Sequence, residues 1–450
     1  MSVEVPNLPK TLAEWLTFAE NISVQPIELG LERMRTMVSR LSIHFDCPVF
    51  TVAGTNGKGS TCAMLESILR SEGYRVGMHT SPHLIRFNER AILDGKEVGD
   101  EALCSAFAEV ERCRQGSPLT YFEFTGLAIL KLFSEQKLDA VILEIGLGGR
   151  LDAMNVIDAS CGIVCAVGID HTAYLGSTRE LIAAEKACIY RSGKPAVVTD
   201  RDPPETLVSY AAQIGAPLSR YGREYDTVER EDSSFDFVFG DVQYERLPRP
   251  ALCGRNQIQN AAGVLCALTL LKSRLPVSRR AIEEGLRRAY MPGRFETLQL
   301  PLLQGIPLCL DVGHNPQAAR ALLENIRSTQ RTGEKLLAVF AMLRDKDMRS
   351  VAQIMAETVA HWFVAPLSGP RGANLEELTQ SMQKAGIPDE KISRFETTSA
   401  ALKEAICQAK QLKNCPVRIL VFGSFVTVGS VVHSLGELES SLEEKDLHAG

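Results

Sequence analysis

The chain has 450 residues, which is enough for two or three domains with substantial cores. Its formal net charge is −6 and it has no block of basic residues, so nucleic acid is not an expected partner. No apolar run reaches membrane-spanning length, the N-terminus is no signal peptide, and the twelve cysteines are scattered without a C-x-x-C pair, so we expect a cytoplasmic protein with neither a membrane partner nor a zinc site.

Two short helices are expected at the start of the chain. Apolar residues at helical spacing predict one helix over 12–19 and a second over 29–41, with Pro26 breaking the chain between them. A buried strand is then predicted by the apolar run over 49–53, and helical periodicity returns over 60–70.

The turn between that strand and that helix, A-G-T-N-G-K-G-S, has the composition of a phosphate-binding loop. Glycines let backbone N–H groups approach an anion, and the helix N-terminus adds a partial positive charge. Lys58 can reach the outer phosphates of a nucleotide, and the hydroxyl of Ser60 or Thr61 can coordinate Mg²⁺. The alternative is a glycine-rich turn with a surface lysine.

The spacing of this loop departs from the common pattern G-x-x-x-x-G-K-[ST]. Val52 stands five residues before Gly57, where the pattern has glycine, and Gly59 separates Lys58 from Ser60. The flanking strand and helix nevertheless supply what the mechanism of phosphate binding requires.

Strands and helices alternate along the rest of the first 290 residues, which predicts an α/β domain. A polar stretch with alternating aromatic residues over 221–247 suggests a small hairpin. The other expected strands are 75–80, 139–145, 161–169 and 194–199, and the other expected helices are 100–114, 120–133, 182–189, 203–214, 256–271 and 281–289.

Isolated polar residues stand at the ends of three of these strands. Glu144 is a lone carboxylate in an apolar strand, which is costly unless it meets a cation, as where an acidic residue helps to hold Mg²⁺. Ser81 follows a strand at the end where α/β sheets bind ligands, with a turn serine as the alternative. His171 also follows a strand, but a lone histidine is more often structural, and Mg²⁺ prefers oxygen ligands.

The run G-L-G-G-R-L-D-A over 146–153 combines a tight glycine turn with two charged groups. Arg150 can bind a carboxylate through two hydrogen bonds, and Asp152 can accept a hydrogen bond from an amine. Lys186, in the helix expected over 182–189, is predicted to face solvent.

The stretch M-P-G-R-F-E over 291–296 is typical of a linker, because proline and glycine stop the preceding helix. Arg294 is placed there to reach a phosphate. Beyond it, a second α/β domain without its own phosphate loop is predicted, followed by a polar tail over 437–450. Its expected strands are 308–312, 335–340, 362–365 and 418–422, and its expected helices are 316–326, 347–358, 374–384 and 400–410.

Together these motifs resemble the Mur-ligase superfamily, and within it the dihydrofolate synthase/folylpolyglutamate synthase family. The resemblance extends with gaps from about 29 to 427 and is carried by A-G-T-N-G-K-G-S, S-P-H, T-Y-F-E, G-L-G-G-R-L-D-A, D-H, P-G-R-F, D-V-G-H-N-P and G-S-F. It implies an α/β fold in which a P-loop Mur-ligase-type ATP-binding domain, residues 1–292, precedes a smaller Rossmann-like α/β domain, residues 293–450.

The resemblance also implies roles for individual residues. Those on the nucleotide would be Gly54, Thr55, Asn56, Gly57, Lys58, Gly59, Ser60, Asn260, Arg294 and Asp311. The metal ligands would be Ser81, Glu144 and His171, and the catalytic residues Glu144, His171 and Lys186, the last as a carbamate facing the metal. Those on a pterin would be Pro26, Ile27, Glu28, Leu29, Thr120, Tyr121, Phe122, Glu123, Leu151, Asp152 and Ala153. From sequence alone, however, packing on the core is the preferred explanation for 26–29 and the default one for the aromatic residues.

Three residues depart from the family pattern in its motifs. Met154 stands where threonine is usual, Cys188 where glycine is usual, and Gly313 where alanine is usual. The sequence offers no explanation for the first two departures, and the third is a small change.

The activity that the resemblance implies is ATP-dependent amide ligation. With Mg²⁺ as cofactor, ATP would phosphorylate a carboxylate, and L-glutamate would attack the acyl phosphate. The acceptors would be dihydropteroate and tetrahydrofolate, and the enzyme would be a monomer. The alternatives are a folylpolyglutamate synthase alone, another Mur-type amino-acid ligase, or a P-loop regulatory ATPase. A peptidoglycan Mur ligase would carry an extra domain, for which about fifty residues before the loop are too few.

Overall fold

The computed structural model describes residues 8–22, 30–254, 256–412 and 414–448, with side chains to residue 436. The predicted pterin contacts Pro26, Ile27, Glu28 and Leu29 lie outside the described residues. The chain forms two compact units, which we describe separately. The N-terminal unit comprises 1–168, 173–251 and 258–290, and the C-terminal unit comprises 169–172, 252–257 and 291–450.

The first 290 residues contain the elements of an α/β domain. They are α1 (Leu12–Asn21), α2 (Glu32–Arg40), β1 (Val49–Ala53), α3 (Lys58–Glu72), β2 (Val76–His79), η1 (Phe87–Arg90), β3 (Ala91–Leu93), β4 (Lys96–Glu97), α4 (Asp100–Arg114), α5 (Tyr121–Ser134), β5 (Ala140–Glu144), η2 (Ala153–Val156), β6 (Cys161–Val164), α6 (Thr172–Leu175), α7 (Arg179–Ala187), β7 (Ala196–Val198), α8 (Glu205–Gln213), β8 (Leu218–Arg220), β9 (Tyr225–Glu229), β10 (Phe235–Phe239), β11 (Val242–Leu247), α9 (Asn256–Leu270) and α10 (Arg279–Arg288).

The main sheet of the N-terminal unit has the strand order β4-β3-β2-β5-β1-β6-β7-β8. From β2 to β8 neighbouring strands pair in parallel, whereas β3 and β4 extend one edge antiparallel. The parallel strands β1, β2, β5, β6 and β7 are buried along their whole length, which is why they read as unbroken apolar runs. The carboxyl ends of β1, β2, β5 and β6 therefore meet at one edge of the sheet.

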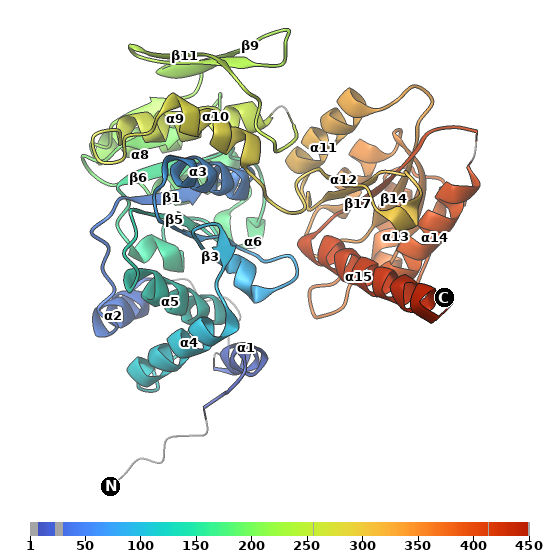
Figure 1. Cartoon of the computed structure of the whole chain (residues 1–450), viewed down its shortest axis with the longest axis horizontal. Helices are drawn as coiled ribbons and strands as arrows, with labels where there is room; N and C mark the ends of the chain where they lie inside the picture. Colours follow the sequence, from blue (N-terminus) through green and yellow to red (C-terminus); the bar gives the residue numbers. More distant parts are fainter. Residues whose placement is uncertain (1–7, 23–29, 255, 413, 449–450) are drawn as a thin grey trace. The chain divides into compact units, whose positions relative to one another are not determined.

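Helices cover both faces of this sheet. In Figure 1, α3, α9 and α10 lie on one side of β1 and β5, and α1, α2, α4 and α5 lie on the other. An apolar core lies on the second side, where the stacked rings of Phe107 and Phe124 pack beside Trp15. Burial of these large side chains is the main source of stability for the layer.

Two expectations for this unit were wrong in detail. The predicted hairpin over 221–247 is a three-stranded antiparallel sheet in the order β11-β10-β9, because Phe235 and Phe237 on its middle strand pair on both sides. The predicted strand 161–169 ends at Val164, since the next residues leave the sheet and bind the phosphate loop.

The C-terminal unit contains a second α/β sheet in the order β12-β13-β17-β14-β15-β16, parallel except for β12. Contacts join α11 to α12 and α12 to α13, while α14 packs on β14 and on α15. The elements are β12 (Glu296–Leu298), η3 (Pro301–Leu303), β13 (Leu308–Asp311), α11 (Pro316–Thr329), β14 (Lys335–Phe340), α12 (Met348–Met355), β15 (Val359–Val364), α13 (Leu375–Lys384), η4 (Asp389–Lys391), β16 (Ile392–Arg394), α14 (Thr398–Gln411), β17 (Val417–Phe422) and α15 (Phe425–His448).

The polar tail expected over 437–450 continues α15 as far as His448. Apolar residues near the start of this helix, including Val428 and Val431, are buried. Their packing stabilises the helix, which the polar composition of its later residues does not predict. The α/β fold class predicted for the whole chain is confirmed. Among the described helices, none has the length and apolar composition needed to cross a bilayer.

Candidate functional site

The phosphate loop leaves the carboxyl end of β1 and ends at the N-terminus of α3. Gly57 is the N-cap of α3. Its backbone has φ +96°, a value that residues with a side chain rarely adopt. Gly54 has φ +150°, and a Cβ there would lie 2.7 Å from Cβ of Cys165. Both positions therefore need glycine, one for backbone conformation and the other also for the close approach of the segment that follows β6.

Hydrogen bonds fasten this loop to the segment after β6. The Thr55 N–H donates to the carbonyl of Ala166 at 2.8 Å. Its hydroxyl donates to the carbonyl of Gly168 at 2.9 Å and accepts from the Gly168 N–H at 3.0 Å. A Cβ on Gly57 would lie 2.7 Å from Oδ1 of Asn260, so this buried side chain lies against the loop. Asn260 is thus placed beside the predicted phosphate site.

Two lysines converge on one carbonyl of the loop. Nζ of Lys58 donates to the Gly54 carbonyl at 3.1 Å, and Nζ of Lys186 donates to the same oxygen at 3.0 Å. Lys186 is only 4% exposed, so the prediction that it faces solvent was wrong.

The physical reason is the packing of α7 on the run 146–153. The N–H of Arg150 donates to the carbonyl of Glu185 at 3.0 Å, and a Cβ on Gly149 would lie 2.5 Å from that carbonyl. Because Gly149 lets α7 approach this closely, Lys186 points toward Gly54 rather than into solvent.

Glu144 and Ser81 meet at the ends of neighbouring strands. Glu144 ends β5, is 2% exposed, and its Oε2 accepts from the N–H of Ser81 at 3.1 Å. Oxygen ligands such as a carboxylate and a hydroxyl suit Mg²⁺, which usually takes one or two carboxylates together with substrate phosphates. Within the described residues, no group of three or more His, Cys, Asp or Glu side chains is placed to hold a metal ion.

The run after β5 also positions the predicted pterin residues. A Cβ on Gly146 would lie 2.8 Å from Cζ of Phe122 and 3.4 Å from Oδ2 of Asp152, so these three residues lie together. Asp152 accepts from the N–H groups of Leu147 and Met154, each at 2.9 Å. Burial raises the pKa of Asp152 to about 6, although these backbone donors oppose the shift.

Part of the T-Y-F-E run has a structural role. Thr120 and Glu123 form a capping box at the start of α5, in which Oε2 of Glu123 accepts from the Thr120 N–H at 2.8 Å. Both Glu123 oxygens also accept from Nε of Arg33, at 2.9 and 3.0 Å. The guanidinium of Arg90 lies 5.8 Å from the Tyr121 ring centre. In contrast, Leu151 and Ala153 flank Asp152 directly, half-buried and buried respectively.

The structure explains two of the three departures from the family pattern. Met154 is fully buried, and a Cβ on Gly126 of α5 would overlap its Cε, so Met154 fills the space that this helix glycine leaves. A Cβ on Gly313 would lie 2.7 Å from Oδ1 of Asp311, so glycine allows that carboxylate to fold onto the backbone. Cys188 donates to the carbonyl of Ala184 at 3.2 Å, which does not explain why it replaces glycine.

Asp311 ends β13 in the C-terminal unit. Its two oxygens accept from the N–H groups of Gly313 at 2.7 Å and Phe295 at 3.0 Å. Burial raises its pKa, and these donors together with the Arg294 charge act in the opposite direction. The Arg294 guanidinium lies 5.2 Å from the ring centre of Phe425. Both predicted nucleotide residues of this unit therefore lie at the carboxyl end of its sheet.

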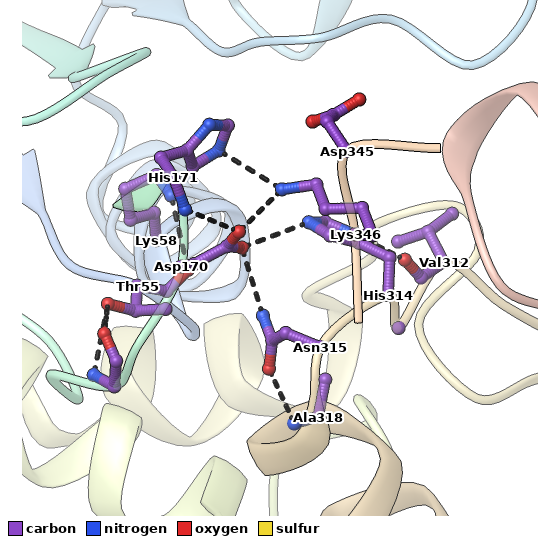
Figure 2. A network of polar contacts seen from close by, with 12 residues as sticks. Thr55, Lys58, Asp170, His171, Val312, His314, Asn315, Ala318, Asp345 and Lys346 are labelled. Atoms are coloured by element: carbon purple, nitrogen blue, oxygen red, sulfur yellow. Dashed lines mark hydrogen bonds and ion pairs between the residues drawn. The ribbon is translucent and has the colours of Figure 1, made fainter. Parts of the chain in front are cut away.

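A polar network surrounds Asp170, which belongs to the segment 169–172 of the same unit (Figure 2). Nζ of Lys346 donates to Oδ1 of Asp170 at 2.6 Å and lies 3.4 Å from Nε2 of His171. Nδ2 of Asn315 donates to Oδ2 of Asp170 at 3.2 Å, and Nε2 of His314 lies 3.4 Å from the same oxygen. His171 itself has φ +51°, a strained conformation that clusters at functional sites.

The charges of this network determine the protonation of Asp170. Burial alone would raise its pKa, but the hydrogen bond from His314 and the charge of Lys346 lower it well below its usual range. Asp170 and Lys346 were not among the predicted site residues. Asp170 stands in the D-H motif, and Lys346 stands in a short run, R-D-K-D over 344–347. The hydrogen bond that joins the two residues spans 176 positions, so the sequence does not show it.

Comparisons with known proteins identify the family of the chain. Residues 52–268 match the Mur ligase middle domain, and residues 293–425 match the Mur ligase glutamate ligase domain. The dihydrofolate synthase/folylpolyglutamate synthase of Escherichia coli K12 is 41% identical over 95% of this chain and 96% of that protein. The same-named protein of Bacillus subtilis 168 is 33% identical over 81% of this chain and 86% of that protein.

Two solved structures are also similar to this chain over almost its whole length. Escherichia coli FolC in complex with DHPP and ADP has a TM-score of 0.88 at 40% identity, covering 97% of this chain and all of that one. A bifunctional folylpolyglutamate synthase/dihydrofolate synthase with Mn, AMPPNP and L-glutamate bound has a TM-score of 0.85 at 39% identity, covering 95% and 98%. The chain therefore belongs to the dihydrofolate synthase/folylpolyglutamate synthase family of Mur ligases, which are ATP-dependent acid–amino-acid ligases.

Proposed function

We propose that this enzyme adds L-glutamate to dihydropteroate, forming dihydrofolate, and to reduced folates, forming folylpolyglutamates, through an acyl phosphate. The observation that carries the proposal is the end of β5. Glu144, at the phosphate side, and Asp152, beside the Phe122 ring, stand on the same short run of chain. A nucleotide and an aromatic acceptor can therefore be held by one structural element of the N-terminal unit.

The phosphates of ATP would bind the N–H groups at the start of α3 and the ammonium of Lys58, with Asn260 against the loop. Glu144 and Ser81 would hold Mg²⁺ through oxygen, and His171 is the third proposed ligand. A bound Mg²⁺ neutralises phosphate charge as it develops. In the C-terminal unit, Arg294 and Asp311 are proposed to contact the nucleotide. Most of the catalytic effect then comes from positioning and charge neutralisation.

Lys186 is proposed to react with CO₂ to form a carbamate, releasing one proton. The burial of Lys186 supports this proposal, because a neutral amine is the reactive form and burial disfavours the ammonium. A carbamate nitrogen keeps one N–H, so it can still donate to the Gly54 carbonyl that Lys186 binds now. The new carboxylate would present negative charge toward the metal.

The pterin is proposed to stack on Phe122 and to donate its amino group to Asp152, with Thr120, Tyr121, Leu151 and Ala153 around it. Glu123 is the weakest member of the predicted set, because the capping box and Arg33 already occupy both of its oxygens. Its contribution to a pterin site would come through the position of α5.

We propose that the enzyme acts as a cytoplasmic monomer on small-molecule substrates, without nucleic-acid or membrane partners. The twelve cysteines are free thiols in the structure. Light scattering during gel filtration tests the monomer directly, since a monomer has a mass of 49.3 kDa.

The function is tested by incubating the enzyme with ATP, L-glutamate and either dihydropteroate or tetrahydrofolate. The masses of the products are then measured by mass spectrometry. Both acceptors should gain glutamate, with release of ADP and phosphate. If tetrahydrofolate gains glutamate and dihydropteroate does not, the enzyme is a folylpolyglutamate synthase alone. ATP turnover that is independent of glutamate and of both acceptors would instead favour a regulatory ATPase.

A further inference from the structure

His79, the last residue of β2, has one ring nitrogen without a hydrogen-bond partner in the part of the chain that the structure describes. Its side chain is 1% exposed, and Nδ1 lies 2.8 Å from the carbonyl oxygen of Arg90. A carbonyl can only accept, so Nδ1 carries the ring proton. Nε2 of the neutral ring is then an acceptor, and it is buried without a hydrogen-bond partner among the described residues.

Such an acceptor is uncommon in a folded protein. Native structures satisfy most buried polar atoms, and an exception requires an explanation such as an absent ligand or water. Packing alone does not explain His79, because an apolar residue would fill the same space without a buried unpaired nitrogen.

The position of His79 points to the acceptor substrate as the missing donor. Its ring centre lies 6.1 Å from that of Phe122, the aromatic residue that lies with Asp152 beside Gly146. His79 pairs with Leu143 on β5, one residue before Glu144, so it belongs to the same strand ends as the proposed substrate site. Neutral pterins carry several N–H donors, whereas Phe122 can offer only its ring face.

We propose that Nε2 of His79 accepts a hydrogen bond from an N–H group of the bound pterin and so helps to select that ring. The assignment rests on the proposed function and adds a residue to it. His79 would complement Asp152, with the two acceptors reading N–H groups beside the stacked ring. A ring without those N–H groups would leave Nε2 unpaired and bind less well.

Two substitutions separate the two ring nitrogens. His79→Asn places an amide N–H near the position of Nδ1, keeping a donor for the Arg90 carbonyl, but it removes the distal acceptor. His79→Gln places a carbonyl near the position of Nε2 and removes the donor at Nδ1. The Arg90 carbonyl still accepts from Thr80 N–H at 3.3 Å in both variants, so neither leaves it unpaired.

The first measurement is the Kd for dihydropteroate in the presence of ADP. A lost neutral hydrogen bond predicts a roughly 3- to 10-fold higher Kd for His79→Asn, against about 2-fold or less for His79→Gln. The Kd for ATP should be unchanged in both variants, which a general loss of structure would not give. Equal Kd values in wild type and His79→Asn, or equal weakening by both substitutions, would overturn the assignment.

The second measurement uses the wild-type enzyme and is independent of variant folding. The ¹⁵N resonance of His79 Nε2 should shift from the value of a free lone pair to that of a hydrogen-bonded one when dihydropteroate binds. An unchanged resonance in the saturated complex means that a water or no group meets Nε2, and the assignment is wrong. If wild-type enzyme does not bind dihydropteroate at all, the proposed function fails instead.

Discussion

At the scale of single residues, Asp152 shows how burial and hydrogen bonding compete. Burial raises its pKa to about 6, above the ordinary value of 3.8 for an aspartate, even though backbone N–H groups stabilise the charged form. The folded protein therefore binds a proton more tightly than the unfolded chain does. Stability from this group is complete below about pH 4 and is lost as the pH rises through about 6.

This predicts a pH-dependent difference between wild type and Asp152→Asn. The free energy of unfolding of wild type, minus that of the variant, should fall by roughly 2–4 kcal/mol between about pH 4 and pH 7 and then level off. Urea unfolding at a series of pH values measures this, and subtraction of the variant removes the contribution of other titrating groups. A difference that rises with pH would show that Asp152 has a lowered pKa.

Glu144 is a buried carboxylate whose charge, rather than its size, is proposed to matter. Glu144→Gln keeps an oxygen for the Ser81 N–H but removes the negative charge. We expect kcat to fall roughly 100-fold or more, by analogy with other lost electrostatic groups, while the melting temperature stays the same or rises. Near-normal turnover in a folded Glu144→Gln enzyme would exclude Glu144 as a metal ligand.

Lys186 is expected to incorporate labelled CO₂. Enzyme equilibrated with ¹³C-bicarbonate should show a carbamate resonance that is absent from Lys186→Ala. That variant should be inactive and partly rescued by acetate, because a free carboxylate can occupy the vacated space. Lys186→Arg is the matched control, since guanidinium keeps the positive charge and forms no such carbamate. A carbamate signal that persists in Lys186→Ala would place the modification elsewhere.

At the scale of elements, glycines determine how closely helices approach their neighbours. Gly149 brings α7 onto the run 146–153, and Gly126 brings α5 onto Met154. Helix propensity alone favours alanine over glycine by about 1 kcal/mol in a helix interior. Contact with distant side chains therefore outweighs local preference at position 126.

Positions 126 and 154 should be energetically coupled. Gly126→Ala should destabilise the protein because the new methyl overlaps Met154, and Met154→Ala should destabilise it by about 2–5 kcal/mol through a cavity. In the double variant the methyl lies in that cavity, so the total loss should be smaller than the sum by at least about 1 kcal/mol. Chemical denaturation of all four proteins measures the coupling. Simple additivity would mean that the two side chains do not compete for space.

At the scale of the whole molecule, two α/β units share one chain that passes between them repeatedly. Segments 169–172 and 252–257 belong to the C-terminal unit although both neighbouring stretches belong to the N-terminal one. The predicted boundary between residues 292 and 293 stays a proposal. Asp170, Lys346, His314 and Asn315 form their network only because the short segment 169–172 joins the second unit.

The two proposed reactions should depend differently on the pterin residues. Phe122→Ala removes a stacking face and Asp152→Ala removes an acceptor, so ligation to dihydropteroate should fall about 10-fold or more in kcat/KM. Extension of tetrahydrofolate should fall much less if it does not rely on the same contacts. Parallel assays of both acceptors on each variant provide the comparison. Equal losses in the two reactions would show that one acceptor site serves both.

Much of this protein could be predicted from local sequence. Apolar runs located β1, β5 and β17, helical periodicity located α3 and α4, and glycines located the phosphate loop, because each signal depends on neighbouring residues only. The family was also recognisable, since each of its motifs is a short uninterrupted run of residues. The residue roles implied by that resemblance remain proposals.

Tertiary structure decided which side chains are available for chemistry. The sequence placed Lys186 in solvent and left Met154 unexplained, whereas close packing at Gly149 and Gly126 buries both. It could not show that Arg33 donates a hydrogen bond to the Glu123 carboxylate, nor that one nitrogen of His79 lacks a hydrogen-bond partner among the described residues. These features depend on residues far apart in the chain, whose approach is determined by strand register and helix packing rather than by local pattern.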